Sequence, residues 1–207
     1  RRSSDLPTYY AHAMNRYMHE FGVTKKDFAE IAVVAREWAT LNPKAVMHSK
    51  ETHPFGGPID LETVLSSRPI AWPLNLLDCC LVTDHGGAVV IVSKEQATEY
   101  KNDPVWIEGS GEAISHINMS QMEDMTMTSA HLSSKRAYEI AGMGPKDMEM
   151  AMLYDSFTYT AGVTAEMVGL APRGEGTNLW KNGLASPKGK FPINTNGGGL
   201  SYSHSGM

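Results

Sequence analysis

The stretch NTNGGGLSYSHSGM, residues 194–207, is the most informative part of this 207-residue chain. It combines two asparagines, three consecutive glycines and, shortly after them, His204. Glycine has no Cβ and tolerates positive φ, so the backbone of such a loop can approach a ligand closely. A flexible linker is also rich in glycine, but an Asn-x-Asn pattern and a nearby histidine are not typical of linkers. The stretch therefore predicts a ligand-facing loop that places His204 beside it.

Two blocks upstream carry further polar and small residues at the ends of apolar runs. Residues 153–157 read LYDSF, and residues 76–88 read LLDCCLVTDHGGA. With the glycine-rich stretch, these blocks resemble the thiolase superfamily in their order along the chain, in the version seen in thiolase-like lipid-transfer proteins. LYDSF stands where thiolases have Asn-Glu-Ala-Phe and where the sterol-carrier type has His-Asp-Cys-Phe. One position departs from the family pattern, because Ser205 occurs where proline is usual.

The resemblance implies an α/β, thiolase-like layered fold that is incomplete in this chain, with a helical loop domain and part of the second βαβαβ half. We expect the helical loop domain in residues 1–75, the end of the N-terminal thiolase half in residues 76–101 and a truncated C-terminal half in residues 102–207. The N-terminal half of the family, with the central helix that bears the nucleophilic cysteine, has no counterpart here. We therefore expect a fragment that is inactive by itself.

Local patterns locate the expected elements. Apolar residues at i, i+3 and i+4, together with capping residues such as Thr24 and Asp60, predict helices. Uninterrupted apolar runs after glycine or polar residues predict strands. Helices are expected at residues 10–21, 28–39, 61–65, 94–101 and 129–141, and another begins at Phe157. Strands are expected at residues 88–92 and 148–153, with a second β-rich unit opening at residues 105–111.

Composition excludes several classes of function. The net charge is −5 and Lys and Arg are scattered, which gives no footprint for nucleic acid or an anionic membrane surface. No apolar run approaches the roughly 20 residues that a membrane-spanning helix needs. Cys79 and Cys80, the only cysteines, are adjacent, which suits neither a structural disulfide nor a metal site. We expect a cytoplasmic protein without a metal.

Three residues are the expected catalytic groups. The resemblance implies that His204 is the family histidine that activates a nucleophile and helps to bind a thioester oxygen, and imidazole can both accept and donate a proton near neutral pH. Tyr154 stands where thiolases have asparagine. Tyr202 lies two residues before His204, on the same side of the chain if that segment is extended. Tyrosines at these positions resemble the thiolase-like aldolases of steroid side-chain degradation, which need no acyl-enzyme cysteine.

The remaining polar residues of the blocks have more than one interpretation. Asparagine side chains of the loop are expected mainly to hold it together through hydrogen bonds to the backbone. Asp155 is expected to cap the following helix or to anchor the loop rather than to react. Cys79 and Cys80 do not align with the family nucleophile and are interpreted as small packing residues. The expected substrate- and CoA-binding residues, whose glycine N–H groups are candidate donors to the thioester, are Asn196, Gly197, Gly198 and Gly199.

These features favour an enzyme that makes or breaks a carbon–carbon bond in lipid- or steroid-derived acyl-CoA thioesters, by retro-aldol cleavage of a β-hydroxyacyl-CoA. One alternative is a β-ketoacyl-CoA thiolase (an acyl-CoA C-acyltransferase) whose cysteine lies outside this chain. Another is a non-catalytic lipid-binding or scaffold subunit. The resemblance further implies a homodimer and a small OB-fold partner of the DUF35 type. CoA would enter as part of the substrate, and we expect no covalently bound cofactor.

Overall fold

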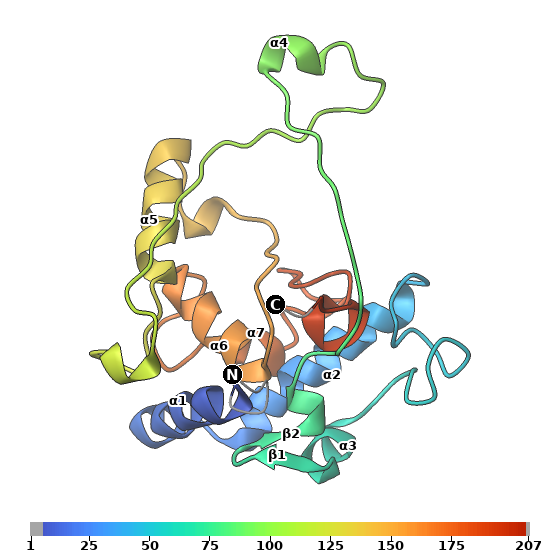
Figure 1. The fold of residues 1–207 in the computed structure, drawn as a ribbon, viewed down its shortest axis with the longest axis vertical. Coiled ribbons are helices and arrows are strands. Elements are labelled where there is room, and N and C mark those ends of the chain that lie inside the picture. The colour runs from blue at the N-terminus through green and yellow to red at the C-terminus, as the bar shows by residue number, and fades with distance from the viewer. Residues whose placement is uncertain (1–5, 206–207) are drawn as a thin grey trace.

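The computed structural model describes residues 6–205 and begins with two long helices, α1 (Leu6–Phe21) and α2 (Lys25–Leu41) (Figure 1). A capping box separates them: the backbone N–H of Asp27 bonds to the Thr24 hydroxyl at 3.4 Å, and the N–H of Thr24 bonds to the Asp27 carboxylate at 2.7 Å. These reciprocal bonds satisfy donors that the first helical turn leaves free. Both predicted helices are confirmed, and the first begins earlier than its apolar repeat indicated.

The other predicted helices form with one change in length. Asp60 caps α3 (Leu61–Ser66), as predicted, and Gly142 follows the last residue of α5 (Ala130–Ala141) in a left-handed conformation. The helix expected at residues 94–101 is only the single turn α4 (Lys94–Ala97). The helix after Phe157 is α6 (Thr158–Met167). The remaining elements are short: η2 (Leu76–Asp78), η3 (Met119–Gln121), η4 (Pro145–Asp147), α7 (Asn178–Lys181) and the π-helical turn η5 (Gly198–Tyr202).

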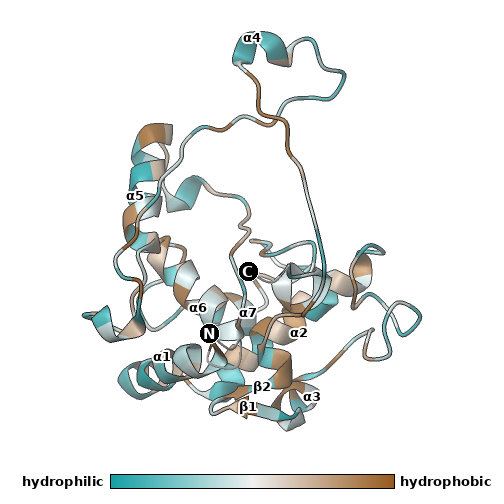
Figure 2. Cartoon of the chain, viewed as in Figure 1, coloured by the Kyte–Doolittle hydropathy of each residue, from teal (hydrophilic) through white to brown (hydrophobic). Residues whose placement is uncertain are grey.

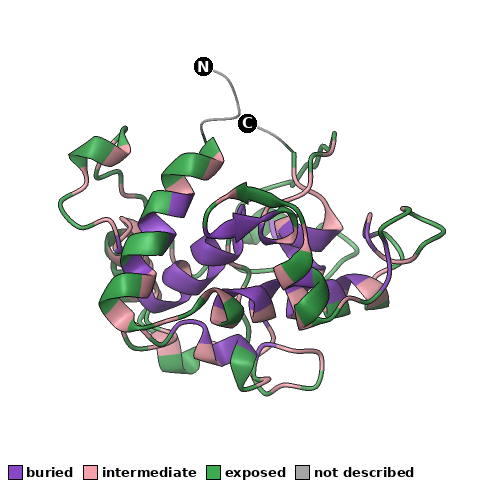
Figure 3. Ribbon diagram, turned by 90° about the horizontal axis from the view of Figure 1, so that it is seen from below, coloured by how far each residue is buried: buried purple, intermediate pink, exposed green. Residues whose placement is uncertain are grey.

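The core lies where α1, α2 and α6 meet, and buried residues concentrate there (Figure 3). Tyr17, Phe28 and Tyr159 form its aromatic centre, with ring centroids 5.6–5.9 Å apart. Helix α6 is buried on every side, which is typical of a helix surrounded by other elements rather than lying at a surface. This packing fixes the position of the residues that precede α6, among them Tyr154 and Asp155.

The predicted strands are wrong as sheet elements. Within residues 6–205 the only sheet is the antiparallel pair β1 (Pro69–Ala71) and β2 (Leu74–Asn75). Residues 88–92 belong to an extended segment that leaves the helical body towards α4, and residues 105–111 belong to the extended segment that returns from α4 and reaches α5 (Figure 1). Residues 148–153 are also extended, but form only an isolated parallel bridge between Ala151 and Ile193.

The reason for this correction is that a strand needs neighbours whereas a helix does not. Val89, Val90 and Ile91 are 74–85% exposed, so their apolar character has no core to enter (Figure 2). Backbone N–H and C=O groups of a strand are satisfied by adjacent strands, and none of the described residues lies beside this run as a strand. The architecture is therefore a helical body with a small sheet, an incomplete α/β arrangement. The division at residues 75 and 101 stays a prediction.

Candidate active site

Tyr154 and His204 meet in a direct hydrogen bond. The phenolic oxygen of Tyr154 lies 3.0 Å from Nε2 of His204, and the ring centroids are 5.6 Å apart. Tyr154 follows the extended residues 148–153, and His204 follows η5, so the fold joins two parts of the chain that are 50 residues apart. Tyr154 is 51% exposed. A substrate can therefore reach a tyrosine–histidine pair that can move a proton.

Asn194 fixes the start of the glycine-rich loop against the segment that delivers Tyr154. Its Oδ1 accepts a hydrogen bond from the N–H of Leu153 at 2.7 Å, and its Nδ2 donates to the carbonyl of Leu153 at 2.9 Å. Asn194 adopts φ 54°, a left-handed conformation that asparagine tolerates. Asn196 accepts from the N–H of Gly198 at 2.8 Å. Both asparagines hold the loop together, as predicted.

Asp155 anchors the other end of the loop. Its carboxylate accepts hydrogen bonds from the N–H of Gly199 at 2.7 Å and from the N–H of Leu200 at 3.3 Å. Burial raises the pKa of this carboxyl, and the N–H donors only partly oppose the rise. A Cβ added at Gly198 would overlap the carboxylate, and Gly198 has φ 63°, so only glycine fits there. The anchoring role weighed for Asp155 is the one that the structure adopts.

The N–H groups of the three glycines form hydrogen bonds within the site itself, whereas the sequence suggested them as donors to a thioester. The N–H of Gly197 bonds to the carbonyl of Asn194 at 2.9 Å, while those of Gly198 and Gly199 bond to side chains of the same site. Gly198 and Gly199 allow the close approach of the loop to Asp155, and Gly197, with φ 107°, allows its close approach to Ala39 of α2. Contact of Asn196 and the glycines with substrate stays a prediction.

Tyr202 does not take part in the hydrogen bond between Tyr154 and His204. It is the last residue of the π-helical turn η5, and the extended backbone begins only at Ser203. The alternation argument, which placed Tyr202 beside His204 on an extended segment, is therefore wrong for this stretch. Its ring instead lies edge-on to His85, with centroids 5.8 Å apart. Tyr202 keeps its place near the loop, while its chemical role stays a prediction.

Two supporting residues were missed from the sequence. The Thr83 hydroxyl forms two hydrogen bonds with the backbone of His204. It accepts one from the His204 N–H and donates one to the His204 carbonyl, both at 2.9 Å. Arg36 is buried and donates to the Ser201 hydroxyl at 3.0 Å, which holds η5 on α2. A signal existed for Arg36, because it falls on the apolar face of the predicted helix at residues 28–39. For Thr83, the signal was its place within the block at residues 76–88.

The surroundings of Tyr154 keep its phenol protonated. Burial raises the pKa of Tyr154, and the neighbouring Tyr10, Cys80 and Asp155 raise it further, while a hydrogen bond with Ser156 opposes them. The Tyr154 hydroxyl donates to Nε2 in the tautomer of His204 that carries its ring proton on Nδ1. A phenolate at this position would be costly unless another group shared the charge.

The two cysteines are poor nucleophiles in this environment. The Cys79 thiol donates to the carbonyl of Asn75 at 3.3 Å, and burial raises its pKa to about 12. Burial also raises the pKa of Cys80. Because the thiolate is the reactive form, both thiols are held in the unreactive state. Within residues 6–205, no group of three or more His, Cys, Asp or Glu side chains is arranged to hold a metal ion, and no helix there is long and apolar enough to span a membrane.

Comparison with known proteins places this geometry in context. Residues 111–207 match the family described as thiolase C-terminal domain-like. The steroid side-chain-cleaving aldolase of Thermomonospora curvata is 37% identical over 196 residues, which are 91% of this chain and 48% of that protein. The benzoylsuccinyl-CoA thiolase subunit BbsB of Thauera aromatica is 36% identical over 200 residues, 94% of this chain and 49% of that protein.

The solved structure of an Ltp2-ChsH2(DUF35) aldolase superposes with a TM-score of 0.84 at 35% identity. The superposition covers 95% of this chain and 51% of that chain. The chain thus spans about half the length of the relatives that it matches.

Proposed function

This chain belongs to the thiolase superfamily, and on that premise we propose that the whole protein cleaves a β-hydroxyacyl-CoA by a retro-aldol reaction. The observation that carries the proposal is the hydrogen bond between Tyr154 and His204 at 3.0 Å. A reactive acyl-enzyme cysteine would need a lowered thiol pKa, and burial raises the pKa of both cysteines instead. The groups present suit proton transfer without a covalent intermediate.

In the proposed reaction, the Tyr154 oxygen takes the proton of the β-hydroxyl and passes its own proton to Nε2 of His204. The Cα–Cβ bond then breaks, the β-carbon becomes the carbonyl carbon of one product, and the electron pair moves into the thioester as an enolate. The proton held by the pair returns to Cα and gives the shortened acyl-CoA. No proton is consumed overall, and no free CoA is needed.

The hydrogen bond to His204 explains how Tyr154 can serve as a base. Burial raises the pKa of the phenol, so an isolated phenolate would be rare at neutral pH. Transfer of the phenolic proton to the imidazole of His204 in the same step avoids that species, because a ring nitrogen of imidazole can accept a proton. Thr83 and Asn194 hold the two backbones, which keeps the pair aligned.

Tyr202 is the proposed donor to the enolate oxygen. It ends the turn η5, which the Asp155 carboxylate and Arg36 hold in place. Asn196 and Gly197–Gly199 are the proposed contacts with the thioester and CoA portion. CoA takes part only as a portion of the substrate, and no covalently bound cofactor is proposed.

The names of two similar proteins support the substrate class and the assembly. The relative from Thermomonospora curvata is named for cleaving steroid side chains, which supports a steroid-derived acyl group. The similar solved structure is named an Ltp2-ChsH2(DUF35) aldolase, which supports an OB-fold partner of the DUF35 type. A homodimer and a cytoplasmic location complete the proposal.

Thiolysis of a β-ketoacyl-CoA is the second candidate. The benzoylsuccinyl-CoA thiolase subunit, at 36% identity, favours it. In that reaction a cysteine from outside this chain would hold the acyl group, and His204 would activate it.

Substitution of the two phenols tests the proposal. Phenylalanine keeps the packing of the ring and removes only the hydroxyl. We expect Tyr154→Phe and Tyr202→Phe, made in the intact and partnered protein, each to lower cleavage of a β-hydroxyacyl-CoA by at least about a hundredfold. Tyr100→Phe is the matched control, because Tyr100 is similarly exposed (56%) but lies beside α4, away from the site. Full activity of both test variants would refute the aldolase proposal.

A further inference from the structure

Residues 79–85 run between the two parts of the candidate site and contact both. The N–H of Cys80 donates to the carbonyl of Ser156 at 2.9 Å, in the segment that precedes α6. The N–H of Leu81 donates to the carbonyl of Gly199 at 3.0 Å, in the glycine-rich loop. This stretch of backbone therefore holds the two parts of the site beside each other.

The contacts of this stretch show which of its sides faces the loop. The Thr83 hydroxyl lies 2.8 Å from the Ser203 hydroxyl and bonds to the backbone of His204. Side chains alternate along an extended chain, so His85 lies on the same side as Thr83, and Val82 lies on the opposite side. Val82 is fully exposed, in agreement with this alternation. His85 therefore faces the loop that Thr83 contacts.

The ring of His85 meets the ring of Tyr202 edge-on. The two centroids are 5.8 Å apart, and the ring planes are inclined at 82°. Aromatic pairs prefer an offset or edge-to-face arrangement with centroids roughly 4.5–7 Å apart. The contact between His85 and Tyr202 has this favourable geometry.

The backbone of Tyr202 is held in place, but a fixed backbone does not by itself fix the ring. The carbonyl of Tyr202 accepts a hydrogen bond from the N–H of Val46 at 2.9 Å, and Arg36 holds η5 on α2. A tyrosine side chain still has several staggered rotamers, and each of them sends the hydroxyl to a different place. The edge-on contact with His85 favours one of these orientations.

We infer that His85 is a positioning residue, whose edge-on contact holds the Tyr202 ring so that its hydroxyl points to the thioester oxygen. The inference rests on the proposed function for the chemical role of Tyr202. It deepens that proposal by assigning the side chain that sets the direction of this hydroxyl. His85 transfers no proton itself and acts only through Tyr202.

Two substitutions separate the ring of His85 from its nitrogen atoms. His85→Ala removes the ring, whereas His85→Phe keeps a flat ring that can pack edge-on and removes only the nitrogens. His85 is exposed, so neither change disturbs the core, and melting curves check this. His53→Ala is the matched control, because the His53 ring packs on Phe55 at the same centroid distance of 5.8 Å, in the loop between α2 and α3.

The kinetics of the intact, partnered protein give the first readout. We expect His85→Ala to lower kcat for cleavage of a β-hydroxyacyl-CoA by roughly tenfold to a hundredfold, because a misplacement of about 1 Å can cost about a hundredfold. KM should not change, since the hydroxyl acts on charge that develops in the transition state. His85→Phe should restore most of the activity, and His53→Ala should match the wild type. Full activity of His85→Ala, or a defect in His85→Phe as large as that in His85→Ala, would overturn the inference.

A double-mutant cycle shows whether His85 acts through the phenol. In Tyr202→Phe the hydroxyl is absent, so adding His85→Ala should cause no further loss of kcat. If the losses of the two single variants instead multiply, His85 acts independently of Tyr202 and the inference is wrong.

A measurement without turnover separates this inference from the proposed reaction. In NMR spectra of the protein with isotope-labelled tyrosine, the Tyr202 ring signal is the one that disappears in Tyr202→Phe. His85→Ala should shift this signal, because the neighbouring ring that affects it is lost, and His53→Ala should not. An unshifted signal would overturn the inference whatever the reaction. A shifted signal in a protein that cleaves no β-hydroxyacyl-CoA would support the contact and refute the proposed reaction.

Discussion

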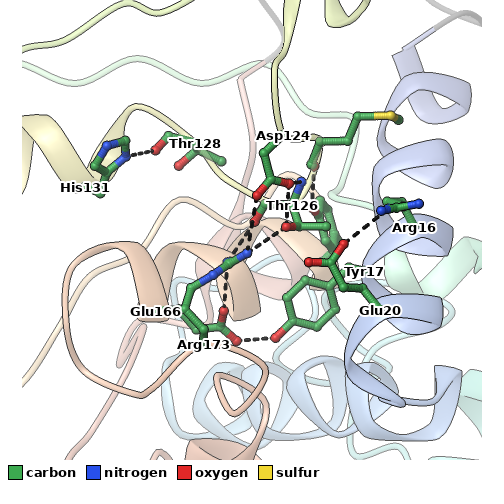
Figure 4. Close-up of polar contacts among 11 residues, drawn as sticks. Arg16, Tyr17, Glu20, Asp124, Thr126, Thr128, His131, Glu166 and Arg173 are labelled. Carbon is green, nitrogen blue, oxygen red and sulfur yellow. Dashed lines mark hydrogen bonds and ion pairs between the residues drawn. The ribbon is translucent and has the colours of Figure 1, made fainter.

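Glu166 and Asp155 are both buried carboxylates, but the groups that compensate their charge differ. Glu166 accepts hydrogen bonds from Arg173 at 3.1 Å, from the N–H of Gly176 at 2.8 Å and from the Tyr17 hydroxyl (Figure 4). Asp155 accepts hydrogen bonds from backbone N–H groups of the glycine-rich loop, and no ion pair to a described residue compensates its charge. One site is an ion pair, and the other is a negative charge held by dipoles.

The difference separates a structural site from a reactive one. Arg173 also donates to the Thr126 carbonyl at 2.9 Å and to its hydroxyl at 2.6 Å, so the ionic network ties residues 124–126 to α1 and α6. Every strong group there has a partner, which leaves none to react. Around Asp155, the half-exposed Tyr154 and the partly buried His204 share a proton that can be transferred. The chain thus pairs its charges where it needs rigidity, and it places a tyrosine and a histidine in contact where it needs proton transfer.

Removal of His204 is the strongest test of this contrast. We expect His204→Ala to lower turnover of the intact protein by roughly a hundredfold to ten-thousandfold, the usual contribution of a proton-transfer group. The melting temperature should change little. His12→Ala, an exposed histidine of α1, should leave both unchanged. Loss of folding without a specific catalytic defect would instead make His204 a structural residue.

The ionic network should give the opposite result. Glu166→Gln leaves Arg173 without its carboxylate, and because Arg173 is one-third exposed we expect a loss of about 2–4 kcal/mol in the free energy of unfolding, at or below the value for a fully buried pair. Denaturant titration measures this loss. Turnover per folded molecule should stay the same. Glu139→Gln, in the exposed pair with Lys135, is the control and should change stability by less than about 1 kcal/mol.

Asp155 should respond to pH in a characteristic direction. Because burial raises its folded pKa above the unfolded value of about 3.9, the unfolded state loses this proton first, and the group costs stability as pH rises through that window. Asp155→Asn removes the titration. We expect it to cost about 1–3 kcal/mol near pH 4, where one loop N–H loses its acceptor, and a smaller net amount at neutral pH. A cost that grows with rising pH would contradict the uncompensated charge.

The cysteines should give the smallest effect. Cys79→Ala combined with Cys80→Ala should lower the free energy of unfolding by on the order of 1 kcal/mol apiece through lost packing. Turnover should be unchanged, because neither thiol is held as a thiolate. A thousandfold fall in turnover at normal fold content would assign chemistry to one of them.

The sequence was most informative where structure depends on nearby residues. The helix at residues 25–41 follows from the cap at Thr24 and an apolar repeat, both of which act within a few residues. The run at residues 88–92 has the composition of a strand, but pairing requires strands supplied from elsewhere, which a local pattern does not reveal.

The candidate site shows the same difference between what local sequence indicates and what long-range contacts determine. Tyr154 and His204 came from matching blocks, and the structure joins them. Thr83 and Asp155 support the site through hydrogen bonds to residues 121 and 44 positions further along the chain. The sequence alone does not specify contacts over such separations.

The most direct test of cysteine-independent cleavage is the requirement for free CoA. The intact, partnered protein is incubated with a β-hydroxyacyl-CoA in the absence of free CoA, and the products are identified by mass spectrometry. The proposed proton transfer between Tyr154 and His204 predicts a carbonyl compound and a shortened acyl-CoA in equal amounts. If no product forms under these conditions, and the protein instead cleaves a β-ketoacyl-CoA only when free CoA is added, the account is contradicted and thiolysis replaces it.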